Sequence, residues 1–138
     1  MYKKDYILRM VEEMIRFIAK VMSLLKEGKP EEAEKWLEKG YQLLKADHQK
    51  MLQMKPGELV QELERQGYDY TKMELKADLI NAESEILAYK QDQKAADLLI
   101  TALAVYEYIE NNHHVYSFER ADKIFFLKSR IGDSPTQD

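Results

Sequence analysis

Apolar residues recur every three or four positions from Asp5 to Glu27, which is the spacing of one face of a long amphipathic helix. The residues on this stripe are Ile7, Met10, Val11, Met14, Phe17, Ile18, Val21, Leu24 and Leu25. Ile15, Ala19 and Met22 widen the stripe beyond a single face. We therefore expect this helix to contact neighbours on more than one side.

A very short turn separates this helix from a second one. Gly28 suits the left-handed conformation that ends a helix, and Pro30 suits the first turn of the next. The second helix is predicted from about Pro30 to Leu44, with acidic residues in its first turn, where the helix dipole favours them. Two helices joined in this way form an antiparallel hairpin, the unit of helical repeat proteins.

Helical patterns continue through the middle of the chain. A short helix is predicted between Pro56 and Gly67. Thr71 and Glu74 then match a capping box, in which a hydroxyl and a carboxylate satisfy each other's free backbone N–H groups. They are expected to start a helix that continues to Tyr89.

Two more helices follow in the last third of the chain. The uncharged run 98–106 predicts the central and most buried helix. Ser117 is a candidate cap for a last helix that ends near Gly132. We expect six or seven helices in one all-α domain over residues 1–132, a compact right-handed array of antiparallel hairpins, with a flexible tail at 133–138.

Composition limits the functions that are open to this chain. The absence of cysteine excludes disulfides, thiolate metal sites and cysteine nucleophiles. A net charge of −4 argues against general nucleic-acid binding, although residues 1–30 carry +3 and residues 31–138 carry −7. Charged residues interrupt the opening segment, and no stretch approaches the roughly 20 apolar residues of a membrane span. We expect a cytoplasmic protein without membrane insertion.

The first hairpin resembles a tetratricopeptide (TPR) repeat. The residues at matching spacing are Phe17, Leu24, Gly28, Ala33, Leu37 and Gly40. Departures are Val21, where the pattern has Gly or Ala, and Lys45, where it usually has Pro. A second and weaker match uses Leu79, Ile86, Ala95, Leu99 and Ala102. The resemblance implies TPR-like hairpins over about half of the chain, with a divergent middle segment.

The chain as a whole also resembles a family of small, uncharacterised bacterial TPR-like proteins. The resemblance is carried by Tyr-x-x-Asp-Tyr-Ile-Leu-Arg-Met at 2–10 and by Ser-Phe-Glu-Arg at 117–120. That family has no assigned activity, so the resemblance supports the fold and implies nothing about chemistry.

The TPR resemblance implies a binding groove lined by the first helix of each pair. Most of the corresponding residues here are apolar: Ile15, Ile18, Met22 and Leu25, then Ala77, Ile80, Ser84 and Leu87. Apolar groove residues mark a partner protein, a bound ligand or coverage by the protein's own helices. The sequence leaves these three alternatives open.

We expect a non-enzymatic protein–protein interaction or scaffold module. The candidate partner-binding residues are Tyr2, Tyr6, Ile15, Ile18, Met22 and Leu25. Their partner is expected to be another protein or a second copy of the chain in a homodimer. The alternative is a helical protein that binds a small apolar ligand.

One constellation has the spacing of metal ligands. Glu110, His113 and His114 lie on one helical face, as in di-iron bundles. Those bundles need two Glu-x-x-His units with further glutamates, and this chain has one. The sequence also lacks a nucleophile elbow and a Gly-rich phosphate loop. We therefore expect no catalytic residue, no metal and no cofactor.

Overall fold

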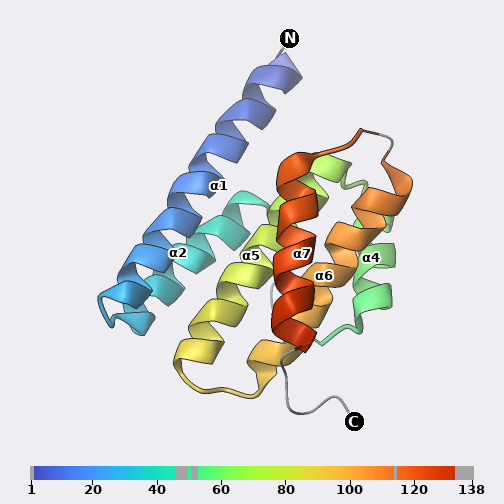
Figure 1. The fold of residues 1–138 in the computed structure, drawn as a ribbon. Helices are drawn as coiled ribbons and strands as arrows, with labels where there is room; N and C mark the ends of the chain where they lie inside the picture. The colour runs from blue at the N-terminus through green and yellow to red at the C-terminus, as the bar shows by residue number, and fades with distance from the viewer. Residues whose placement is uncertain (1, 46–49, 51–52, 114, 133–138) are drawn as a thin grey trace.

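The computed structural model describes residues 2–45, 50, 53–113 and 115–132, with side chains from Asp5 onward. The described residues form six helices and contain no strand (Figure 1). The helices are α1 (Tyr2–Lys26), α2 (Pro30–Leu43), α4 (Pro56–Arg65), α5 (Tyr70–Tyr89), α6 (Lys94–Asn112) and α7 (Phe118–Gly132). The predicted all-α class is therefore confirmed, and the predicted tail at 133–138 lies outside the described residues.

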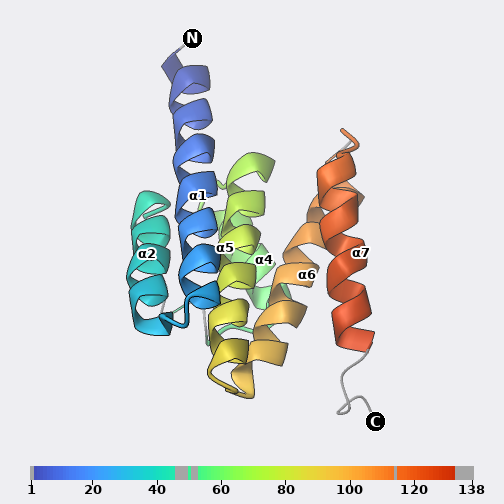
Figure 2. The same cartoon turned by 60° about the vertical axis from the view of Figure 1, so that its left-hand side comes forward.

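Helices α1 and α2 form the hairpin that the sequence predicts. Gly28 has a φ of +76°, and its N–H donates to the carbonyl of Leu25 at 3.0 Å. The N–H of Lys29 donates to the carbonyl of Leu24 at 2.9 Å, which completes a Schellman motif. Pro30 is the first residue of α2. The turn reverses the chain, so α2 runs back along the lower half of α1 (Figures 1 and 2).

Helix α5 is the centre of the fold. It packs against α1, α2 and α6, and it contributes to both hydrophobic clusters of the core. Leu79 belongs to the cluster shared with α1 and α2, whereas Ala77 and Ile80 belong to the cluster shared with α4, α6 and α7. The run 98–106 lies in α6, which packs against α4, α5 and α7 and is largely buried apart from Ile100, so α6 is the central helix of the second cluster.

The α2–α5 interface combines a close backbone approach with buried polar groups. A Cβ atom on Gly40 would lie 2.5 Å from Cδ2 of the buried Leu79 side chain, so any larger residue at this crossing would force Leu79 to shift. The hydroxyl of the next residue, Tyr41, donates to the carboxylate of Glu83, one turn after Leu79 on α5, at 2.7 Å. The Lys76 ammonium lies 4.2 Å from the centre of the Tyr41 ring. This buried cluster fixes the register of α2 on α5.

The start of α5 differs from the predicted capping box. The cap is Asp69, whose carboxylate accepts a hydrogen bond from the N–H of Lys72 at 2.8 Å. Thr71 lies inside the helix, and Glu74 binds Arg120 and Lys123 of α7. Asp69 and Thr71 are both suitable caps, and the structure uses Asp69. The Glu74 side chain points to α7 because its ion-pair partners lie there.

Helix α7 covers one side of α5 and α6. The Ser117 hydroxyl caps it as predicted, accepting from the N–H of Arg120 at 3.2 Å. Leu127 is fully buried, while Phe118 and Phe125 are exposed. Much of the attachment of α7 to α5 therefore comes from ion pairs.

Candidate functional site

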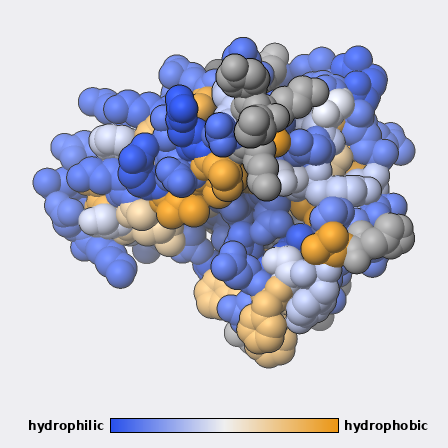
Figure 3. Space-filling view, turned by 90° about the horizontal axis from the view of Figure 1, so that it is seen from above, coloured by the Kyte–Doolittle hydropathy of each residue, from blue (hydrophilic) through white to orange (hydrophobic). Residues whose placement is uncertain are grey.

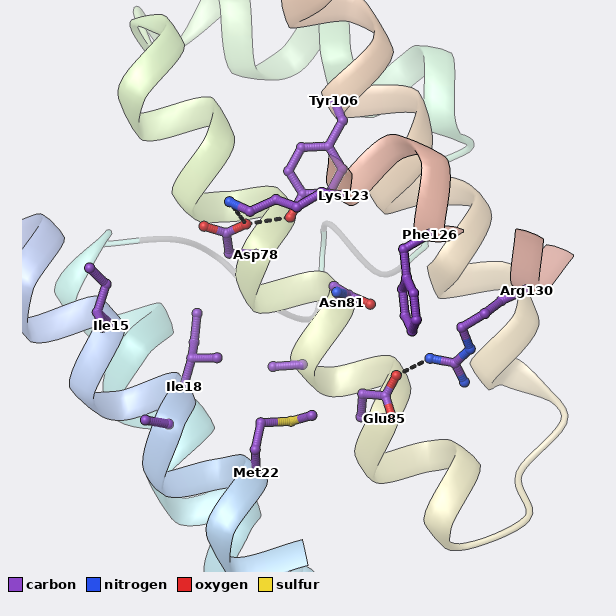
Figure 4. Close-up of a pocket in the computed structure, with 12 residues that line it drawn as sticks. Ile15, Ile18, Met22, Asp78, Asn81, Glu85, Tyr106, Lys123, Phe126 and Arg130 are labelled. Carbon is purple, nitrogen blue, oxygen red and sulfur yellow. Dashed lines mark hydrogen bonds and ion pairs between the residues drawn. The ribbon is translucent and has the colours of Figure 1, made fainter. Parts of the chain in front are cut away.

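A groove of about 650 Å³ lies between α1 and α7, with α5 as its floor. The residues from α1 are Ile15, Ile18, Ala19 and Met22; the floor residues are Asp78, Asn81, Ala82 and Glu85 from α5 and Tyr106 from α6; Lys123, Phe126 and Arg130 come from α7. Figure 4 shows side chains of α1 and α7 directed toward this space from opposite sides. The site thus joins segments that are more than a hundred residues apart in the chain.

The α1 wall is apolar and exposed to solvent. Ile15 is 62% exposed and Met22 is 37% exposed, while Ile18 is half-buried against the α1–α2–α5 cluster. These residues lie on the face of α1 next to the one that packs in the core, which Met14 and Val21 occupy. A helix that is apolar on two faces therefore uses one of them for folding and leaves the other open.

The remaining predicted binding residues do not line the groove. Tyr6 is exposed, but it precedes Ile15 by nine residues, about two and a half turns, and so lies on the opposite side of α1. Leu25 is buried in the core between α1 and α2, which corrects the expectation that it faces a groove. The side chain of Tyr2 lies outside the described residues.

The predicted second wall of the groove is wrong in its residues and its polarity. Ala77 and Ile80 are buried in the α4–α6 cluster, because the face of α5 directed at the groove is rotated by one residue, about 100°. Asp78 and Glu85 take their place. The groove therefore has an apolar wall on α1 and a floor on α5 that contains two acidic residues. The space-filling view shows a hydrophilic hollow beside hydrophobic surface (Figure 3).

The α7 wall combines one aromatic residue with two cations. Phe126 is 56% exposed, and the Arg130 guanidinium lies 5.7 Å from its ring centre. Arg130 also pairs with Glu85 on the floor. The Lys123 ammonium lies 3.0 Å from the Asp78 carboxylate. These two cations of the groove are thus neutralised by the acids of α5.

Burial and charge shift the pKa values at the upper end of the groove. Burial raises the pKa of Asp78, although the charge of Lys123 and a hydrogen bond from the Tyr106 hydroxyl act in the opposite direction. Burial lowers the pKa of Lys123, but Asp78 and Glu74 outweigh it, so the pKa is raised. One ammonium between two carboxylates holds its proton, and the more buried carboxylate is harder to ionise.

Arg120 holds the amino end of α7 in place, one turn before Lys123. Its guanidinium donates to the Glu110 carboxylate at 2.6 Å, to the Glu74 carboxylate at 3.2 Å and to the carbonyl of Val115 at 2.9 Å. Glu110, a member of the candidate metal constellation, is therefore engaged by an arginine, and His114 lies outside the described residues. No group of three His, Cys, Asp or Glu side chains suited to a metal occurs among the residues that the structure describes.

The ion pairs between α5 and α7 follow a regular register, which the sequence analysis missed. Arg120 pairs with Glu74, Lys123 with Asp78 and Arg130 with Glu85, at sequence separations of 46, 45 and 45 residues. The two helices therefore run in the same direction with complementary charge stripes. The matching spacing of acids in 74–85 and bases in 120–130 is a signal that the sequence contained.

Comparison with known proteins adds a family to this description. A family of unknown function, DUF6483, matches residues 1–115. The chain belongs to this family. No curated protein and no solved structure matched. The α1 wall and the α5 floor of the groove lie within the residues matched to DUF6483, whereas α7 lies outside them.

None of the described helices combines the length and the apolar composition that crossing a membrane requires.

Proposed function

We propose that this DUF6483 protein is a non-enzymatic interaction module that binds a helical segment of a protein partner along α1. The observation that carries the proposal is the exposure of Ile15 on a groove whose opposite wall presents Phe126. A large apolar side chain gains about 1.5–3 kcal/mol when it is removed from water. Exposed apolar residues on both walls of one concave surface are typical of a protein-binding site.

The proposed anchors are Ile15, Ile18 and Met22, with Phe126 as the opposing contact. Ile18 contributes its outer edge, since it is half-buried against the core. Tyr6, although exposed, lies on the opposite side of α1 and is therefore not among the proposed anchors. Anchors that enter a concave site and exclude water account for most of the affinity of an interface.

The double variant Ile15→Glu with Met22→Glu tests this proposal. Both side chains are exposed, so we expect the variant to keep its helical content in far-UV circular dichroism. Ile100→Glu on α6 is the matched control, because Ile100 is 44% exposed and does not line the groove. Native mass spectrometry of the untagged proteins detects self-association, and affinity capture from the source cells detects a different partner.

We expect a dimer or a captured protein with the unmodified chain and with Ile100→Glu, and its loss with the double variant. Equal retention by all three proteins would place the interface elsewhere. A folded chain that remains a bare monomer and retains nothing from the lysate would contradict the proposal.

The second candidate is a small apolar ligand. The groove volume of about 650 Å³ lies in the range of ligand pockets, roughly 300–1,000 Å³. The ion pairs of the floor argue against this alternative. An apolar molecule would remove them from water without offering hydrogen bonds in return, which is unfavourable. A reproducible extra mass on the purified chain would favour this alternative.

We also propose the finer features of the fold and setting that the resemblance implies. These are a TPR-like, right-handed arrangement of the α1–α2 and α5–α6 hairpins, a bacterial source and a cytoplasmic location. The glycine turn at Gly28 and the close contact at Gly40 support the hairpin arrangement. The net charge of −4 supports a partner other than nucleic acid.

A further inference from the structure

Helix α7 places charged residues against the body of the protein and aromatic side chains in solvent. Its two buried residues are Arg120 and Leu127. Phe118, by contrast, is 78% exposed and Phe125 is 72% exposed. A surface helix usually presents its large apolar residues to the core and its charges to water. Helix α7 lies at the edge of the array of helices (Figure 2), and its docking leaves much of its apolar surface uncovered.

The contacts that hold α7 are mostly electrostatic. Leu127, with the half-buried Ile124 and Ile131, supplies the apolar part. Apart from the buried Arg120, the ion pairs have cations that are 32–59% exposed: Lys123 with Asp78, Lys128 with Glu107, and Arg130 with Glu85. Ion pairs of this exposure stabilise little, and salt screens them. We therefore expect α7 to separate from the body at a lower cost than the helices that form the two core clusters.

The surface under α7 is built without α7. Helices α5 and α6 form it, and they pack on each other within one hydrophobic cluster. Its acidic residues pair with the bases of α7 and are Glu74, Asp78, Glu85, Glu107 and Glu110. Charge complementarity selects a partner by the sign and spacing of its charges. This surface, called the acidic face below, therefore selects a basic helix with the spacing found in 120–130.

Exposed apolar residues gather where the chain enters α7. Val115 is 63% exposed and Tyr116 is 69% exposed, and Phe118 follows them. Residues 113–117 connect α6 to α7. When two copies of a protein exchange a terminal helix, the connecting segments of the two copies meet about the two-fold axis. Exchange of α7 would therefore bring apolar side chains together that a single chain exposes to water.

We infer that two copies of the chain exchange α7, so that α7 of each copy docks on the acidic face of the other. A second copy is the occupant that the contacts specify, because it brings the same bases in the same register together with the same Leu127. The exchanged dimer keeps the contacts of α7 and adds those of 115–118. Each groove beside α1 then receives its α7 wall, which includes Phe126, from the partner. This inference does not depend on the proposed function, which concerns the open side of α1.

Cross-linking tests the exchange directly, because the chain contains no cysteine. One full-length chain carries Glu85→Cys on α5 and another carries Arg130→Cys on α7, at residues that form an ion pair. The chains are mixed at high salt, returned to low salt and treated with a short bis-maleimide reagent. A chain with both substitutions shows that the reagent spans the pair within one copy, and Glu107→Cys with Lys128→Cys provides a second pair. In the matched control, Ser129→Cys on the exposed side of α7 replaces Arg130→Cys.

We expect about ten times more cross-linked dimer from Glu85→Cys with Arg130→Cys than from the Ser129→Cys control, because docking holds the two cysteines at a high effective concentration. Keeping the mixture at low salt throughout should lower the yield, since the ion pairs then hold α7 on its own chain. The yield should rise with protein concentration, because exchange competes with docking within one chain. The dimer should persist when both chains also carry Ile15→Glu and Met22→Glu.

The outcomes separate this inference from the proposed function. Cross-linking within one copy, without a dimer above the Ser129→Cys control, would show that α7 stays on its own chain and would overturn the inference. A dimer that Ile15→Glu and Met22→Glu abolish forms through α1; it would overturn the exchange and support the proposed function. A dimer that persists in that variant confirms the exchange, and the proposed function then depends on the affinity capture alone.

Discussion

Substituting Arg120 by Met should lower the free energy of unfolding by about 2–3 kcal/mol. The Arg120 side chain is 5% exposed and makes three hydrogen bonds, to Glu110, Glu74 and Val115. Breaking a buried ion pair costs about 3–5 kcal/mol because the remaining charge is left without a partner. Here water can reach the two carboxylates in part, since Glu110 and Glu74 are 27% and 21% exposed. The loss should therefore be smaller.

Urea denaturation followed by far-UV circular dichroism measures this loss. Arg130→Met is the matched control: the same change on the same helix, at a side chain that is 32% exposed and pairs with Glu85 alone. The control should lose less than about 1 kcal/mol, as is usual for ion pairs near the surface. Equal losses for the two variants would refute the argument that the buried, multiply hydrogen-bonded Arg120 anchors α7 more strongly than an ion pair near the surface.

Two further predictions concern buried polar groups. Tyr41→Phe removes the donor to the buried Glu83 carboxylate and should lower the free energy of unfolding by about 1.5–3 kcal/mol, as measured by urea denaturation. The control Tyr6→Phe, at an exposed position, should leave the free energy of unfolding unchanged. Asp78 has a raised pKa in the folded chain, so its contribution to stability is present at acidic pH and is lost as the pH rises through that pKa. Asp78→Asn should therefore gain stability relative to the unmodified chain as the pH rises above about 4, the ordinary pKa of the carboxyl. A constant difference in denaturation midpoint would contradict the direction of the shift.

The parts of the fold that local sequence determines could be predicted. The turn at Gly28 and Pro30 needs only a residue that tolerates positive φ and one that suits a helix start, and both lie within three positions. The Ser117 cap likewise depends on a hydroxyl three residues before its donor. The central position of α5 was missed because Lys76 and Glu83 suggest an exposed face. The structure instead buries both beside Tyr41.

The candidate site could be predicted only on the α1 side. The excess of apolar residues at Ile15 and Met22 showed that α1 has a second face. The floor depends on the rotation of α5 about its axis, which contacts with α1, α2 and α6 set together. The opposite wall depends on where α7 docks, and that follows from charge pairs more than forty residues apart in sequence. The spacing of apolar residues within one helix predicts neither the rotation of α5 nor the position of α7.

The unequal lengths of α1 and α2 have a consequence for the rate of association. At about 1.5 Å per residue, the 25 residues of α1 extend some 16 Å beyond the 14 residues of α2. The first turns of this overhang, before the buried Met10, contain Leu8 and project from the body of the protein (Figures 1 and 2). A helix end with little tertiary packing unfolds and refolds locally, so its amide hydrogens should exchange with solvent faster than those of the lower half. A partner could then make its first contact with the projecting turns. Docking would order these turns, and the loss of conformational entropy would reduce the affinity without lowering the association rate.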